Sequence, residues 1–458
     1  MARRRRSCRA RASAARVAHR ASARCRVNLL DSVRDAADGA QSCMTWRRLG
    51  LLLAVGIAFG GDAFAAVQEE AAPQAANPAE TREQELLAKR REKANQRQPY
   101  RPNRVEATLF TIEDTRLFTR IFDPPQGAFA AVGGPGEGAG FGGGGGYRVG
   151  TETLNLSLAA TGSFKQYWQL DALFRAQDLA GGRAYVELGA RHRDAPRENF
   201  FGLGPETPLA DRTNYTLQMT TLTSRGGIEI GRDVTLSAEV EYLRPRVSGG
   251  QDEKHLSIEQ RFDDLDAPGL SAEPQLLYAG ASLVYEGRDQ PGNPRRGGRY
   301  AISWGHTRDR DEDRYAFQRL MVDVEQVLPF WGEQRRFVLR GVGVQTDPDA
   351  GREVPFYLMP ALGGGNTLRG FKTNRFRDQS ALLLRAEYRY ELNAFLVAAL
   401  FADAGQVAPS WDAMSRRNFK RNYGFGLRFG AATVVLRADV AFASGEGTRF
   451  VLRFGGML

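Results

Sequence analysis

The chain has 458 residues, of which 25% are charged and 42% hydrophobic, and its formal net charge at neutral pH is +10. Residues 1–65 contain 13 Arg and four Asp, which accounts for +9 of this charge and leaves +1 for the rest of the chain. The basic character therefore belongs to the N-terminal end, and the body of the chain has no cationic surplus that would indicate nucleic-acid binding.

The N-terminal region has the three-part pattern of a secretory signal peptide. A basic stretch at 44–48 precedes the 13-residue apolar run 49–61, and the small residues at 63–65 supply a cleavage site. The apolar run is shorter than the roughly 20 residues of a membrane-spanning helix. We expect residues 44–65 to be the signal peptide, Met44 to be the initiator, and residues 1–43 to be an extension outside the natural protein. The alternative, a basic nucleic-acid-binding arm at 1–43, makes little sense ahead of a signal peptide.

All three cysteines precede residue 44, so the exported chain can form neither a disulfide nor a cysteine metal site. Residues 66–104 are rich in Ala, Glu, Gln, Arg and Pro. Asn77 and Pro78 could cap a short, mostly polar helix over 80–93. With 39 residues the segment is smaller than a typical domain. We interpret 66–104 as a largely disordered periplasmic linker.

The body of the chain consists of runs in which polar and apolar residues alternate, which is the pattern of β-strands with one apolar face. In one run, Arg385, Glu387 and Arg389 share a face and Leu384 and Ala386 lie opposite. Strands are clear from about residue 150, and fourteen are expected at 152–160, 167–175, 183–193, 214–224, 234–246, 276–286, 299–307, 315–327, 335–345, 381–391, 395–403, 421–429, 433–442 and 448–454. A glycine-rich stretch at 138–149 and a segment within 106–133 would complete sixteen.

The lengths of the connections indicate the kind of sheet. From the second gap onward, most short connections alternate with long ones, and the long ones lie at 194–213, 247–275, 346–380 and 404–420. Outer-membrane barrels show this alternation because their periplasmic turns are tight and their outer loops are long. A soluble sandwich has no reason to sort its loops in this way. We therefore predict an all-β fold for 105–458, a transmembrane antiparallel β-barrel of 16 strands.

The long connection 346–380 contains the run Gly363-Gly-Gly-Asn-Thr-Leu368-Arg369-Gly370-Phe371. This run and the five strands after it resemble the BamA/TamA outer-membrane assembly family, also called bacterial surface antigens. The turn at 288–298, the strand end at 401–405 and the run at 200–204 match as well. The resemblance covers about 130–458. It implies that the loop folds back into the barrel lumen with Leu368, Arg369, Gly370 and Phe371 at its tip.

The resemblance also implies that Arg369 pairs with acidic side chains on the inner wall of the strands that follow. A buried guanidinium without acceptors is energetically expensive, and bidentate bonding to a carboxylate would make a directional latch. By position and parity, the partners would be Asp403 and, less directly, Glu387. The alternative is an ordinary external loop in which Arg369 is solvated.

Catalytic, metal and cofactor sites are not expected. The chain has no G-x-S-x-G elbow and no G-K pair for a phosphate loop. His192, His255 and His306 lack metal-ligand spacing. The glycines at 138–143 match a dinucleotide fingerprint only formally, without its strand-to-helix context. The acidic run 263–266 is interpreted as a solvated loop.

The resemblance implies a function in the bacterial outer membrane. Assembly members of the family carry periplasmic POTRA domains, for which the segment ahead of the barrel leaves no room. We therefore expect a POTRA-less barrel, in contact with outer-membrane lipid, that assists insertion or translocation of protein or lipid. Its partners would be client outer-membrane or secreted proteins. The alternative is a passive pore or structural surface antigen with a loop-plugged lumen.

Overall fold

The structure is a computed structural model that describes residues 78–95, 121–332, 334–430 and 436–454. The chain divides into two compact units, 1–97 and 98–458. In the first, the described part is the mostly polar helix α3 (Pro78–Asn95). The extension expected at 1–43 and the signal peptide expected at 44–65 lie outside the described residues. None of the described helices combines the length and apolar character needed to cross a membrane.

Helix α3 contains the helix anticipated over 80–93. Its 18 residues lie within the segment that we interpreted as a largely disordered linker at 66–104. The remainder of that segment is not among the residues described.

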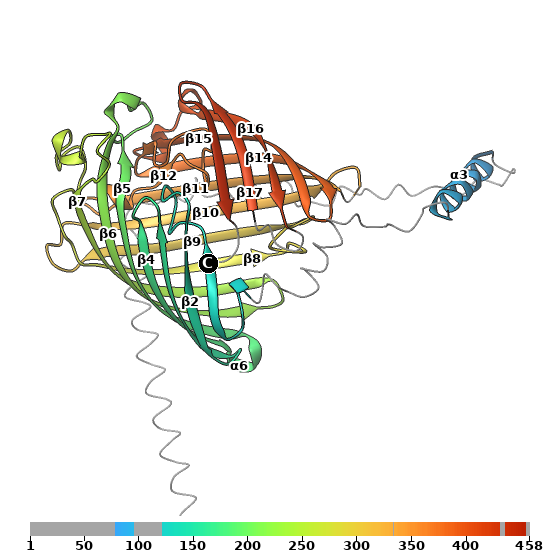
Figure 1. The fold of residues 1–458 in the computed structure, drawn as a ribbon, viewed down its shortest axis with the longest axis horizontal. Coiled ribbons are helices and arrows are strands. Elements are labelled where there is room, and N and C mark those ends of the chain that lie inside the picture. Colours follow the sequence, from blue (N-terminus) through green and yellow to red (C-terminus); the bar gives the residue numbers. More distant parts are fainter. Residues whose placement is uncertain (1–77, 96–120, 333, 431–435, 455–458) are drawn as a thin grey trace, which may run out of the picture. The chain divides into compact units, whose positions relative to one another are not determined.

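The second unit is an antiparallel sheet of 16 strands that curls into a nearly closed barrel (Figure 1). Each strand pairs with its neighbour in the sequence, and only β12 and β13, which form a small separate ladder, interrupt that order. The strands are β1 (Gly127–Val132), β2 (Gly142–Gly150), β3 (Leu154–Ser163), β4 (Trp168–Asp178), β5 (Ala184–Phe200), β6 (Thr213–Ile230), β7 (Val234–Gly249), β8 (Leu276–Glu286), β9 (Gly297–Asp309), β10 (Ala316–Pro329), β11 (Arg335–Pro348), β12 (Ala361–Leu362), β13 (Phe376–Arg377), β14 (Ser380–Asn393), β15 (Leu396–Ala408), β16 (Lys420–Phe429), β17 (Leu436–Ala443) and β18 (Gly447–Phe454). Short helices occupy the connections: α6 (Leu179–Gly182), η1 (Leu209–Asp211), η2 (Ile258–Gln260), η3 (Phe356–Leu358), η4 (Trp411–Ala413) and η5 (Arg416–Asn418).

The predicted 16-stranded barrel is confirmed. Each of the fourteen alternating runs forms a strand, the glycine-rich stretch forms β2, and β1 lies within 106–133. Several strands are longer than expected, notably β5 with 17 residues and β6 with 18. In the outer part of β5, over 194–200, the residues no longer alternate between a polar and an apolar face. The backbone ladder therefore continues where the alternation that reveals it has ended.

Successive residues of each strand face opposite sides of the barrel wall, as the pleat requires. On β16, Tyr423, Phe425 and Leu427 are 66%, 52% and 47% exposed on the outside, whereas Asn422 and Arg428 are buried on the inside. Large apolar side chains exposed over a whole surface would cause aggregation in water. They suit a wall that contacts lipid.

The sheet ends at β1 and β18, which face each other across a seam. Among the described residues, no backbone hydrogen bond joins these two strands. The Phe454 ring packs on the edge of Phe141 with centroids 5.8 Å apart, and a Cβ at Gly133 would lie 3.9 Å from that of Phe454. The barrel is thus closed here by side-chain contact rather than by a ladder.

The glycines of β2 shape the wall beside this seam. A Cβ at Gly144 would lie 2.0 Å from the carbonyl oxygen of Ala160 on β3, and one at Gly146 would lie 2.3 Å from the Phe129 ring on β1. These positions have no room for a side chain, so the glycine run permits the close approach of three strands.

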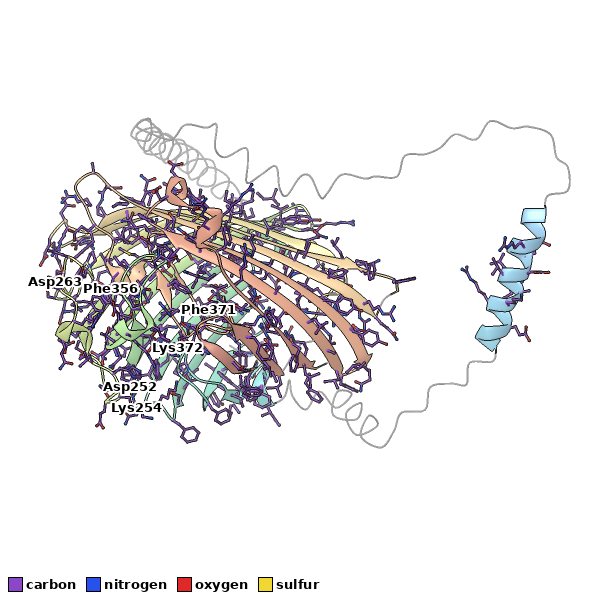
Figure 2. The ribbon with its side chains drawn as sticks, turned by 90° about the horizontal axis from the view of Figure 1, so that it is seen from above. Asp252, Lys254, Asp263, Phe356, Phe371 and Lys372 are labelled. Carbon is purple, nitrogen blue, oxygen red and sulfur yellow. The ribbon has the colours of Figure 1, made fainter. Side chains whose placement is uncertain are left out.

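The lumen loop, defined as residues 349–379 between β11 and β14, folds into the barrel. In Figure 2, Phe371 lies farther than Asp263 and Phe356 from the end of the barrel that carries the long loops. Apolar side chains anchor the lumen loop to the barrel wall. Together with wall residues they form a buried cluster that comprises Leu362, Leu368, Phe371, Phe376, Ala381, Leu383 and Val407. Burial of this cluster supplies the hydrophobic free energy that holds the loop inside.

Candidate functional site

A glycine turn presents Arg369 to the barrel wall. Gly364 N–H donates to the carbonyl oxygens of Leu368 and Phe371, at 3.1 and 3.0 Å. Gly363 and Gly364 have φ of +117° and +100°, which favour glycine. A Cβ at Gly363 would also lie 2.1 Å from the carbonyl oxygen of Lys372. Gly363 and Gly364 are therefore structural requirements of the turn.

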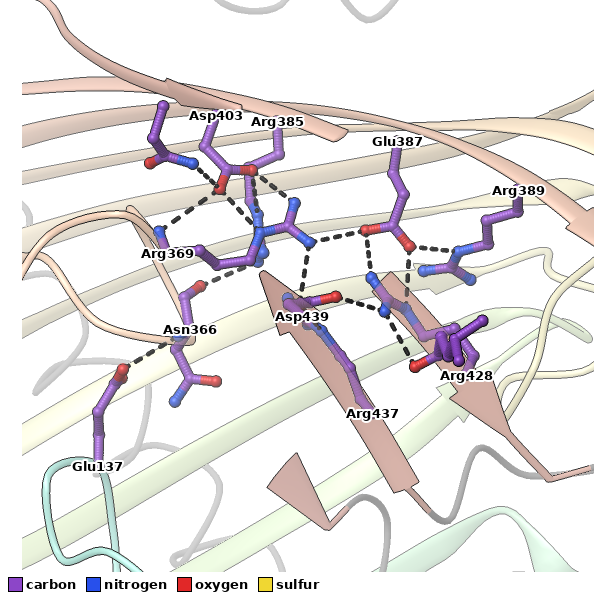
Figure 3. A network of polar contacts seen from close by, with 12 residues as sticks. Glu137, Asn366, Arg369, Arg385, Glu387, Arg389, Asp403, Arg428, Arg437 and Asp439 are labelled. Atoms are coloured by element: carbon purple, nitrogen blue, oxygen red, sulfur yellow. Dashed lines mark hydrogen bonds and ion pairs between the residues drawn. The ribbon is translucent and has the colours of Figure 1, made fainter. Parts of the chain in front are cut away.

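The guanidinium of Arg369 is fully buried and binds three carboxylates (Figure 3). Its Nε and Nη2 donate to the two oxygens of Asp403 at 2.8 and 2.6 Å, a bidentate arrangement. Its Nη1 donates to Glu387 at 3.0 Å and to Asp439 at 3.3 Å. The guanidinium carbon lies 3.4 Å from the centre of the Phe401 ring, which adds a cation–π contact.

Further arginines hold Glu387 and Asp439 in place. Arg428 donates to Glu387 at 3.0 Å and to Asp439 at 2.5 Å, so it bridges the two acids. Arg389 donates to Glu387 at 2.8 Å, and Arg437 donates to Asp439 at 2.6 Å. Both carboxylates are thus held by arginines of the wall as well as by Arg369 of the lumen loop.

Asp403 is fixed in a similar way. Asn422 Nδ2 donates to it at 2.9 Å and Arg385 Nε at 3.2 Å. Arg385 also donates through Nη1 to the carbonyl oxygen of Asn366 at 3.0 Å, so one wall residue contacts both the acid and the loop.

Strand periodicity places the whole network on one inner wall. Residues 385, 387 and 389 follow one another at every second position of β14, while the other groups come from β15, β16 and β17. On β16 a glycine makes the space, because a Cβ at Gly426 would lie 2.0 Å from Oδ1 of Asp439. The pair between Arg428 and Asp439 therefore depends on Gly426.

Positive and negative charges are not equal in number in this network. Burial alone would lower the pKa of Arg369, but the hydrogen bond and charge of Asp403, with the charges of Glu387 and Asp439, raise it. Arg369 is therefore cationic at every physiological pH. The network as a whole brings five guanidinium groups to three carboxylates, which leaves a surplus of positive charge.

The sequence reasoning placed Arg369, Asp403 and Glu387 together, and in the structure Arg369 contacts both acids directly. Leu368 and Phe371 lie in the buried cluster beside them. Gly370 is needed for close packing, since a Cβ there would lie 2.7 Å from the Cβ of Asn422 on the wall.

The sequence reasoning missed Asp439, Arg428 and Arg437. One signal could have found them. The alternation in 421–429 and 433–442 assigns Arg428 and Asp439 to lumen faces, and the hairpin register brings Arg428 opposite Arg437.

Other sequence features have structural partners of their own. His192 contacts Thr220 at 2.8 Å, His255 contacts Asp252 at 2.9 Å, and His306 contacts Asp349 at 2.9 Å. The glycines at 138–143 belong to the β1–β2 connection and the start of β2. Within the described ranges, no group of three or more His, Cys, Asp or Glu side chains is arranged to hold a metal ion.

These features define a class, the transmembrane β-barrel with a loop folded into its lumen. Residues 155–456 match the Omp85 superfamily domain. The chain belongs to the Omp85 superfamily. Family and fold together imply a location in the bacterial outer membrane. A search of curated proteins by sequence finds no match.

A solved structure shares this fold. BamA from Haemophilus ducreyi, lacking POTRA domains 1–3, is 13% identical with a TM-score of 0.53, over 71% of this chain and 68% of that one. CdiB from Acinetobacter baumannii is 11% identical with a TM-score of 0.44, over 71% of this chain and 59% of that one. CdiB from Escherichia coli is 11% identical with a TM-score of 0.47, over 72% of this chain and 62% of that one. At these identities the likeness to BamA bears on the fold alone.

Proposed function

We propose that this barrel assists the insertion or translocation of protein or lipid at the outer membrane, and that Arg369 is the latch of its lumen loop. One observation carries the proposal. The lumen loop is bonded to the barrel on both sides of a seam that has no backbone pairing between its described strands.

On the C-terminal side of the seam, the loop is tied at two levels. The deeper tie is the bonding of Arg369 to Asp403, Glu387 and Asp439. Nearer the outer end, Arg375 Nε donates at 2.6 Å to Glu446 in the β17–β18 connection.

On the N-terminal side, the same loop contacts the connection after β1 and the outer end of β5. The backbone N–H of Asn366 donates to Glu137 at 3.1 Å. Asn374 Nδ2 donates to Glu198 at 2.9 Å, and Asn199 Nδ2 donates to the carbonyl oxygen of Thr373 at 3.2 Å. The loop therefore spans the seam from inside.

The strands at the seam are short, with six residues in β1 and eight in β18, against 17 in β5. A short edge strand with unpaired backbone groups can accept another strand. Withdrawal of the lumen loop would remove the ties on both sides at once. The seam edges would then be available to a client polypeptide, which is the step that we assign to this protein.

The test is depletion of the protein followed by a quantitative outer-membrane proteome. We expect a specific set of clients to decline, to recover with the wild-type gene, and to recover poorly with Arg369→Ala. The matched control is Arg232→Ala, in the tight turn between β6 and β7, which should complement fully. An unchanged proteome after depletion would refute the proposal and favour a passive pore or structural surface antigen.

Conductance recordings in lipid bilayers distinguish independently between a barrel closed by its lumen loop and a passive pore. A barrel with its lumen loop in place should stay closed or flicker briefly. A steady open current from the wild-type protein would favour the passive pore.

A further inference from the structure

A row of three arginines crosses the last three strands of the barrel. The strand register places Arg428 of β16 opposite Arg437 of β17, and Arg437 opposite Arg453 of β18. Directly opposed residues have Cβ atoms about 4.5–5.5 Å apart, and like charges at that spacing are destabilising. The row therefore needs negative charge close to it.

The neighbouring carboxylates are already engaged. Asp439 accepts hydrogen bonds from Arg369, Arg428 and Arg437, and Glu387 accepts from Arg369, Arg389 and Arg428. Arg437 donates to Asp439 only through Nε.

Two arginines of the row, Arg437 and Arg453, have N–H groups that no described carboxylate accepts. Nη2 of Arg437 is buried without a hydrogen-bond partner in the part of the chain that the structure describes. Arg453 likewise makes no ion pair with any described residue. A buried guanidinium N–H without an acceptor is costly, so Nη2 of Arg437 calls for an acceptor from outside the network. The half-buried Arg453, directly opposite on β18, can share that acceptor.

The lumen loop covers this part of the wall. A Cβ at Gly365 would lie 3.3 Å from Cδ of Arg453 and 2.8 Å from Cγ1 of Val451, so the loop backbone rests on the β18 side chains. Figure 3 shows Arg437 and Asp439 on one strand and Arg428 beside them on the next. Arg453, on the seam strand β18, thus lies between the wall and the loop, and Arg437 lies opposite it on β17.

We propose that Arg437 and Arg453 form a binding site for a phosphate-class oxyanion inside the barrel, next to the seam. Guanidinium groups recognise such anions through paired N–H donors. A tetrahedral phosphate has acceptors enough to bond both arginines at once. The bound anion offsets the like-charge repulsion along the row. Because the site adjoins the seam, its ligand can be free inorganic phosphate or the headgroup of a phosphorylated lipid.

The test is isothermal titration calorimetry of the full chain in dodecyl maltoside micelles. Inorganic phosphate is the probe, at constant ionic strength with chloride as the other anion. We expect saturable binding that is at least tenfold weaker in the double variant Arg437→Gln/Arg453→Gln. The matched control Arg232→Gln removes a guanidinium far along the sequence, in the β6–β7 turn, and should bind as the wild type does.

Micelles that contain phosphatidylglycerol distinguish the two sources. Competition with phosphate would assign the site to a lipid headgroup, and phosphate binding without competition would assign it to the free anion. Absence of saturable phosphate binding, or equal binding by the double variant, would overturn the proposal. If the double variant fails to fold, the wild-type barrel still decides. Phosphate should raise its heat-conversion temperature on gels above the value in chloride, and equal temperatures would contradict the site.

Discussion

Replacing Arg369 by alanine is the sharpest perturbation of the network. The change removes the bidentate bond to Asp403, two single bonds to other carboxylates and the contact with Phe401. Breaking a buried ion pair from one side costs about 3–5 kcal/mol, because the remaining charge stays buried. Asp403 keeps Arg385 and Asn422 as partners, so the loss of stability in Arg369→Ala should not exceed this range.

We expect Arg369→Ala to lower the free energy of unfolding by about 3–5 kcal/mol. Unfolding by urea in detergent micelles, monitored by tryptophan fluorescence, measures this change. Arg369→Lys keeps the charge but cannot bond both oxygens of Asp403 and Glu387 together, so its loss should be intermediate. In a double-mutant cycle, adding Asp403→Ala should cost far less in the Arg369→Ala background than in the wild type. Unfolding of Arg369→Ala within about 0.5 kcal/mol of wild type, the usual range for surface substitutions, would refute this reasoning.

Three further changes test separate parts of the fold. Glu446→Gln removes the charge that Arg375 bonds at the outer tie, so trypsin should cleave the lumen loop faster; cleavage at the wild-type rate would contradict the second tie. Gly426→Ala brings a methyl group against Asp439 and should lower the free energy of unfolding by about 1–3 kcal/mol, and an unchanged urea midpoint would count against the packing described. Leu427→Arg places a charge on the lipid face and should destabilise the folded barrel in lipid by about 2–4 kcal/mol, whereas equal stability in vesicles would argue that this face does not meet lipid.

Much of the barrel was predictable because a bilayer imposes a strict pattern on each strand. The alternating runs identified fourteen of the sixteen strands of the barrel, and the alternation in 381–391 gave the lumen face of β14 correctly. The outer extension of β5, over 194–200, was not predictable in this way. There the backbone still pairs, but neither face contacts lipid, and the residue pattern carries no period.

The site was only partly predictable, for a geometric reason. The motif resemblance pointed to Arg369, and strand parity pointed to Asp403 and Glu387. The contact with Asp439 depends on how four strands and a folded loop meet in three dimensions, 70 residues apart in sequence. It also depends on the absence of a side chain at Gly426, which no local pattern reveals.

A reversible cross-link of the seam tests the central claim most directly. Cysteines at Gly133 and Phe454 would have Cβ atoms 3.9 Å apart, within the range of a disulfide, and the natural cysteines all precede residue 44. The single variant Gly133→Cys controls for the left-handed backbone at that position. In cells that depend on the double variant, client assembly should stop under oxidising conditions and resume after reduction. Undiminished assembly by a fully cross-linked barrel would contradict a function that works through this seam.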